Sequence, residues 1–133
     1  MSLTEAEREA RKQSRLGKKY IYPWIGVDLD RTLAEYHEFV SPTHIGAPIE
    51  KMVNRVKKFL EDRIAVKIFT ARVADTDPAL RIEIIEAIDR WCIEVFGRTL
   101  PVTCVKDYGM VRLYDDRAIQ IVPNTGERVD GED

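Results

Sequence analysis

Several polar side chains of this sequence come directly after apolar segments, at the points where strands of a sheet would end. They provide four carboxylates, one hydroxyl and one ammonium group: Asp28, Asp30, Asp115, Asp116, Thr70 and Lys106. The carboxyl ends of parallel strands meet at one edge of a sheet, where ligands of such folds bind. Carboxylates gathered at one edge repel one another unless a cation neutralises them. The pattern therefore predicts a cation site.

The residue types favour a hard divalent cation and an anionic substrate. Mg²⁺ takes oxygen ligands, usually one or two carboxylates together with waters and substrate phosphate oxygens. No His or Cys stands at these strand ends, which argues against zinc. The Thr70 hydroxyl and the Lys106 ammonium group suit a tetrahedral anion. We therefore expect Mg²⁺ as the cofactor and metal-assisted phosphoryl transfer as the chemistry.

The first two aspartates suit different chemical roles. Asp28 and Asp30 are two residues apart at a strand end, so a local turn can bring both side chains to one side. A carboxylate can attack phosphorus and form an aspartyl-phosphate, which divides one difficult displacement into two easier ones. A second acid must then protonate the leaving alkoxide and later activate water. Asp28 suits the nucleophile, and Asp30 suits the acid/base.

These motifs, in this order, resemble those of the haloacid dehalogenase (HAD) superfamily of phosphotransferases. The matching residues are Asp28-x-Asp30-x-Thr32, Thr70, Lys106 and Asp115-Asp116, and the resemblance spans residues 24–122. It implies that Asp28 is the nucleophile and a Mg²⁺ ligand. It implies that Asp30 is the acid/base and binds the metal through its backbone carbonyl group. Thr70 and Lys106 would bind the phosphoryl group.

Two of the motifs leave choices open. By the same resemblance, one or both of Asp115 and Asp116 complete the metal site, with Asp115 favoured as the inner ligand. The family's first motif most often has glycine where this chain has Arg31. Arg31 either binds a charged substrate or is a solvated loop residue. Arg72 and Arg117 flank the expected crevice, where they either contact substrate or form surface ion pairs.

The apolar pattern predicts the elements that position these residues. Short apolar runs predict strands at 24–27, 64–69, 102–105, 111–114 and 118–122. Helical spacing, with Pro48 and Asp77-Pro78 at the starts, predicts helices over 49–60 and 78–96. Strands that alternate with helices indicate βαβ units. We expect an α/β fold with a three-layer, Rossmann-like, mainly parallel sheet of about five strands, the first of them central.

The expected domain organisation is a charged N-terminal arm or helix at 1–19, a HAD-like catalytic domain at 20–126 and a polar tail at 127–133. The arm carries six Lys/Arg and three Glu. It is expected to pack on the domain or on a neighbouring subunit, with a nucleic-acid contact as the alternative. The gaps between motifs are too short for a cap domain of ~50 residues. An open, capless site needs a macromolecular substrate or the partner subunit of a homo-oligomer as a lid.

Composition limits the function classes. The 133 residues are 44% hydrophobic and 33% charged, as in ordinary globular domains, and the net charge of −2 gives no general attraction to polyanions. No apolar run approaches the ~20 residues of a membrane span, and the charged N-terminus has no apolar signal core. Cys92 and Cys104 form no motif and read as reduced thiols. We expect a cytoplasmic protein without a membrane partner.

The expected activity is hydrolysis of a phosphomonoester, either a phosphorylated small molecule or a nucleic-acid end. Nucleotides rank first because Asp115-Asp116-Arg117 resembles the last motif in the phosphatase half of phage-type polynucleotide kinase/phosphatase. The alternative is a catalytically degenerate HAD-like module used for binding or assembly. All four motifs contain their reactive residue types, which favours catalysis.

Overall fold

The computed structural model describes residues 4–9, 22–74 and 77–132. Within the expected N-terminal arm, residues 5–9 are helical. The Glu7 backbone N–H donates to Thr4 Oγ1 at 3.1 Å, and Thr4 Oγ1 donates to Glu7 Oε1 at 2.9 Å. This pair forms a capping box, which stabilises a helix start. The rest of the expected arm, including residues 10–19, lies outside the described residues.

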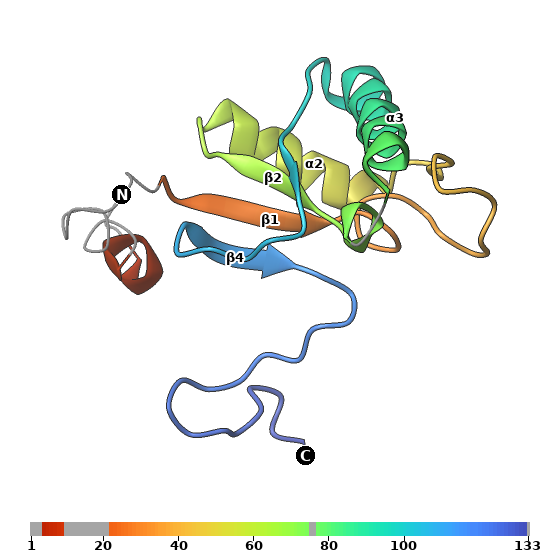
Figure 1. Cartoon of the computed structure of the whole chain (residues 1–133). Helices are drawn as coiled ribbons and strands as arrows, with labels where there is room; N and C mark the ends of the chain where they lie inside the picture. Colours follow the sequence, from red (N-terminus) through yellow and green to blue (C-terminus); the bar gives the residue numbers. More distant parts are fainter. Residues whose placement is uncertain (1–3, 10–21, 75–76, 133) are drawn as a thin grey trace.

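The described strands form one parallel sheet in the order β3-β2-β1-β4. The strands are β1 (Trp24–Asp28), β2 (Val66–Phe69), β3 (Val102–Thr103) and β4 (Met110–Tyr114). The predicted parallel α/β arrangement and the central position of β1 are confirmed, and Figure 1 shows β1 between β2 and β4.

The strand predicted at 118–122 does not join the sheet. Ile121 instead makes an isolated antiparallel bridge with Arg128. The Val122 N–H donates to the Glu127 carbonyl at 2.7 Å, and the Val129 N–H donates to the Gln120 carbonyl at 2.9 Å. The segment therefore pairs with the chain that follows it. The described sheet has four strands, not five.

Two long helices connect the strands, and their ends lie close to where the sequence predicts them. They are α2 (Glu50–Glu61) and α3 (Pro78–Phe96), with the short 3-10 helix η1 (Ala71–Val73) between β2 and α3. Asp77 caps α3, since its Oδ2 accepts a hydrogen bond from the Leu80 N–H at 3.2 Å. Gly97 ends the helix with φ 75°, a left-handed conformation that glycine adopts without steric cost.

The described domain has two layers, so the three-layer prediction is wrong for this part of the chain. Ile25 and Val27 of β1 join both helices in one core, which includes Val56 of α2 and Ile88 of α3. Right-handed crossovers that run in one direction, from β1 to β2 to β3, place both helices on the same face. The opposite face is crossed by the connection 104–109, which runs over β2 to reach β4 (Figure 1). Trp24 Nε1 donates to Asp107 Oδ1 of this connection at 2.9 Å.

Residues 35–47, here called the flap, form a loop between β1 and α2 that is fixed to the domain at both ends. The Glu35 N–H donates to the Ala47 carbonyl at 2.8 Å, and Trp91 Nε1 of α3 donates to the Gly46 carbonyl at 3.0 Å. A Cβ atom at Gly46 would overlap the Glu35 carbonyl oxygen, so this close approach requires glycine. Among the described helices, none has the length and apolarity needed to cross a bilayer.

Candidate functional site

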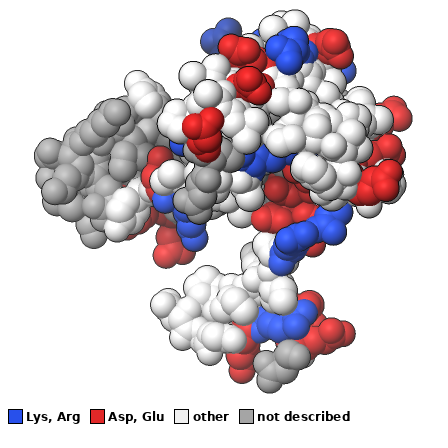
Figure 2. Space-filling view, turned by 45° about the vertical axis from the view of Figure 1, so that its right-hand side comes forward, with Lys and Arg blue, Asp and Glu red and all other residues white. Residues whose placement is uncertain are grey.

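A pocket of about 540 Å³ opens at the carboxyl ends of β1, β2 and β4. Its polar side contains four carboxylates, three guanidinium groups and two hydroxyls: Asp28, Asp30, Asp115, Asp116, Arg31, Arg72, Arg117, Ser41 and Thr70. Figure 2 shows acidic and basic side chains side by side near the point where the C-terminal segment leaves the main body. The structure thus brings most of the predicted site residues to one edge of the sheet.

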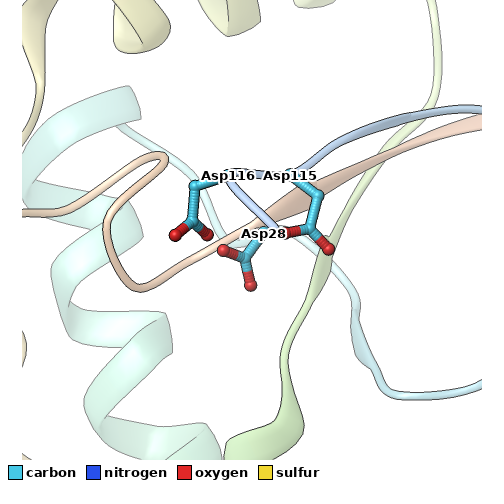
Figure 3. Close-up of side chains that lie close together, drawn as sticks. All are labelled: Asp28, Asp115 and Asp116. Atoms are coloured by element: carbon cyan, nitrogen blue, oxygen red, sulfur yellow. The ribbon is translucent and has the colours of Figure 1, made fainter. Parts of the chain in front are cut away.

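Three of the aspartates form a cluster, here called the acidic triad: Asp28, Asp115 and Asp116. One carboxylate oxygen from each lies within 4.8 Å of the other two. Asp28 ends β1, whereas Asp115 and Asp116 follow β4, so parallel pairing of the two strands creates the cluster. Figure 3 shows the three side chains converging. The donors are hard oxygens, as Mg²⁺ or Ca²⁺ require, so the residues fit such an ion.

The triad changes the acidity of its own members. Burial, the hydrogen bond with Asp116 and the negative charge of Asp115 together raise the pKa of Asp28 from 3.8 to about 7. For Asp116, desolvation raises the pKa, but the hydrogen bond with Asp28 and the charge of Arg31 outweigh it, and the pKa is lowered overall. Two carboxyl groups this close share one proton near neutrality, with Asp28 as its holder. A divalent cation would displace that proton.

Thr32 connects the two halves of the triad. Its Oγ1 donates to Asp28 Oδ2 at 3.1 Å and accepts from the Asp116 N–H at 3.1 Å. The hydroxyl therefore fixes the β1 end against the loop after β4. From the sequence, Thr32 is predicted only as part of a motif, without a function of its own. The spacing Asp28-x-Asp30-x-Thr32 is the signal that points to it.

Arg31, for which the sequence left substrate binding or a solvated loop position open, lines the pocket and pairs with the triad. Its Nε lies 3.1 Å from Asp116 Oδ2, and its side chain is 42% exposed. Its φ is 69°, a left-handed conformation that costs a non-glycine residue free energy. This backbone geometry explains why glycine suits the position in the motif that the chain resembles. The arginine at this position places a positive charge beside the acidic triad.

Asp30 does not join the triad, because Arg72 binds both of its oxygens. Arg72 Nη2 lies 2.7 Å from Asp30 Oδ1, and Arg72 Nε lies 2.9 Å from Asp30 Oδ2. Nη1 of the same guanidinium donates to the carbonyls of Pro42 and His44 in the flap, at 3.0 and 2.6 Å. The sequence left two roles open for Arg72, substrate contact or a surface ion pair. In the structure, it joins Asp30 to the flap, and the guanidinium is largely buried.

Thr70 and Lys106, the two predicted phosphoryl ligands, lie in different places. Thr70 is 2% exposed and lines the pocket, and its Oγ1 accepts from the Arg72 N–H at 3.2 Å. Its hydroxyl hydrogen can therefore still be donated. Lys106 is exposed and lines a neighbouring hollow along β4, which shares Phe69 and Asp115 with the pocket. The structure brings Thr70, but not Lys106, to the pocket that contains Asp28.

The pocket has an apolar side that the sequence argument missed. Tyr36 and Phe39 line it from the flap, and Leu80 and Ile84 line it from α3. Phe39 is 70% exposed, more than Tyr36 at 36%. Its signal in the sequence is weak, because aromatic residues of a loop follow no periodic pattern.

Comparisons with known proteins do not place the chain in a family. No protein-family model matches the sequence, and no curated protein matches it. Among solved structures, it is similar to a conserved protein from Bacteroides thetaiotaomicron, with a TM-score of 0.47 and 19% sequence identity. The match covers 77% of this chain and 83% of the other. Any proposal about the family and the activity of the chain therefore rests on the residues of its own pocket.

Proposed function

We propose that the protein is a HAD-like, Mg²⁺-dependent phosphatase that hydrolyses phosphate monoesters through an aspartyl-phosphate on Asp28. The acidic triad is the observation that carries this proposal. Its three carboxylate oxygens lie within 4.8 Å of one another at the carboxyl edge of a parallel sheet, where folds of this class bind ligands. A divalent cation there would neutralise part of the charge of the three carboxylates and could also bind a phosphoryl oxygen.

The residues of the pocket can divide the reaction between them. Asp28, Asp115 and Asp116 would hold Mg²⁺, which when bound neutralises charge on the phosphoryl group. One Asp28 oxygen would attack phosphorus, so that a bond between this oxygen and phosphorus forms while the ester P–O bond breaks. Thr70 would donate its hydroxyl hydrogen to a phosphoryl oxygen. Water would then attack phosphorus and release phosphate, which restores the Asp28 carboxylate.

Asp30 is the group we propose for proton transfer. It would protonate the leaving alkoxide and later accept a proton from the attacking water. In the structure, both oxygens of Asp30 accept hydrogen bonds from Arg72, which keeps them directed toward the guanidinium. Arg72 must therefore release one Asp30 oxygen before the first step. The anionic phosphoryl group of a substrate offers the guanidinium an alternative partner.

A binding or assembly module without catalysis is the second candidate. Two observations favour it: Arg72 occupies the proposed acid/base, and Lys106 lies outside the pocket. In such a module, the acidic triad would bind a metal ion, but the phosphate ester would remain intact. Nucleotides or nucleic-acid ends stay the first-ranked substrates, and a homo-oligomer that supplies a lid stays a proposal.

The test is release of inorganic phosphate from a panel of phosphate monoesters, with Mg²⁺ and with a chelator. We expect turnover in Mg²⁺ that the chelator abolishes and that Asp28→Asn reduces by at least ~10³-fold. Asp62→Asn is the matched control, since Asp62 is an exposed carboxylate paired with Lys58 at the end of α2. Metal binding by the wild type without turnover of any ester would favour the second candidate.

A further inference from the structure

We infer that the pocket selects phosphate monoesters whose leaving group carries an aromatic ring, and that Phe39 is the residue that recognises the ring. This inference rests on the proposed function, because the acidic triad must bind the phosphoryl group of the same molecule. It adds the chemical class of the substrate, which the motif residues do not specify.

The pocket is divided in composition between charged and apolar side chains. Beside the acidic triad, its lining includes Tyr36, Phe39 and Pro42 from the flap and Leu80 and Ile84 from α3. Apolar walls bind the apolar part of a ligand, whereas a few polar groups fix its orientation. The charged side suits the phosphoryl group of a substrate, and the apolar side suits the leaving group of the ester.

The pocket also has room for more than a phosphoryl group. Its volume of about 540 Å³ lies within the range of ~300–1,000 Å³ typical of sites for small organic ligands. A phosphoryl group and a metal ion at the acidic triad would fill only part of it. The remaining space borders the apolar wall, so the leaving group of the substrate is the part that would contact it.

Hydrogen bonds fix the backbone of the flap, which carries the aromatic side chains, before any ligand binds. Its two ends are joined by the hydrogen bond between Glu35 and Ala47, and Trp91 holds Gly46 from α3. Arg72 binds the middle of the flap through the Pro42 carbonyl at 3.0 Å. A backbone that is already ordered loses little conformational entropy on binding, which favours recognition of a rigid ligand such as an aromatic ring.

Phe39 is the side chain with the most surface left to bury. It is 70% exposed although it lines the pocket, whereas Tyr36 is 36% exposed and Ile84 is 2% exposed. An aromatic ring offers a π-face, so an aromatic partner gains a stacking contribution in addition to area burial. A phenyl group and a nucleobase share this chemistry, and the experiment must separate them.

The experiment compares kcat/KM values within two pairs of substrates for the full chain in Mg²⁺, with release of inorganic phosphate as the readout. The first pair is 2-phenylethyl phosphate and ethyl phosphate, and the second is adenosine 5′-monophosphate and ribose 5-phosphate. Within each pair, the two leaving groups are alkoxides of similar basicity, so the aromatic ring is the main difference between the substrates. We expect the ringed member to be favoured about tenfold in at least one pair. The pair with the larger ratio identifies the source of the ring.

Variants at position 39 connect that ratio to the proposed residue. Phe39→Ala should lower the ratio severalfold toward one, and Phe39→Tyr should restore it. Val40→Ala is the matched control, because Val40 is the adjacent exposed side chain and does not line the pocket. A wild-type ratio near one in both pairs, or a ratio that Phe39→Ala leaves unchanged, would overturn the inference while the phosphatase proposal stands. If the protein hydrolyses other phosphate monoesters but none of these four, the inference about the ring is wrong and the phosphatase proposal stands.

Discussion

Replacing Asp28 by asparagine should stabilise the metal-free protein, and the gain should depend on pH. Asparagine has nearly the shape of a protonated aspartate, so it can keep the contacts with Thr32 and Asp116 without the charge. Burial, the hydrogen bond with Asp116 and the charge of Asp115 raise the pKa of Asp28 from 3.8 to about 7 in the folded protein. Ionised Asp28 is therefore a source of instability that the variant lacks.

The sign and size of the effect follow from proton linkage. Between pH 3.8 and about 7, the folded state holds more protons on Asp28 than the unfolded state, so wild-type stability falls as the pH rises through this range. A shift of this size corresponds to at most about 4 kcal/mol. Asp28 is half-buried, and solvent screening reduces the effect to about 1–2 kcal/mol. The gain for Asp28→Asn should be small below about pH 4.5 and complete above about pH 7.

Thermal unfolding followed by circular dichroism, in the presence of a chelator, measures this gain. Above neutral pH we expect the Tm of Asp28→Asn to exceed that of the wild type by roughly 3–8 °C, and the difference to shrink in acid. Added Mg²⁺ should raise the Tm of the wild type more than that of the variant, because the variant has lost a ligand. A variant that is less stable than the wild type at high pH would refute the argument from carboxylate repulsion.

Three further substitutions test other contacts. Arg31→Gly and Arg31→Ala both remove the ion pair with Asp116, but at φ 69° the glycine variant should be the more stable by about 1 kcal/mol in urea unfolding; equal stability would contradict the backbone argument. Gly46→Ala should lower the unfolding free energy by about 1–3 kcal/mol, because the new Cβ overlaps the Glu35 carbonyl oxygen, and an unchanged Tm would show that the flap adjusts at no cost. Arg72→Lys removes the two-point contact with Asp30 and should speed chymotrypsin cleavage at the aromatic residues of the flap severalfold; cleavage at the wild-type rate would contradict the role of Arg72 in holding the flap.

Much of the fold could be predicted because its signals are local. The cap at Asp77, the left-handed glycine at Gly97 and the apolar stripes of the helices each lie within a few residues of the element that they define. The number of layers could not be predicted in the same way. It depends on the order of the strands, and that order follows from contacts between distant segments. The segment 118–122 has a strand-like composition but pairs with residues that follow it.

The candidate site shows the same division. The acidic triad could be predicted, because strand ends of a parallel sheet must meet at one edge. The pairing of Asp30 with Arg72 could not, since the two residues are 42 positions apart and each had other partners of opposite charge at the same strand ends. Lys106 lies in the connection 104–109, and no periodic pattern in the sequence predicts the path of this connection over the sheet. Phe39 is in a loop, where the direction of a side chain depends on tertiary contacts.

Acid-quench trapping of the phosphorylated protein tests the central proposal most directly. The full chain is mixed with Mg²⁺ and a phosphate monoester, quenched in acid within the first turnover, digested and analysed by mass spectrometry. The account predicts a phosphoryl group on the peptide that contains Asp28, removed by hydroxylamine as expected of an acyl phosphate, and absent from Asp28→Asn. Turnover by the wild type with no phosphoryl group on that peptide, in an experiment that traps a control aspartyl-phosphate enzyme, would contradict the account.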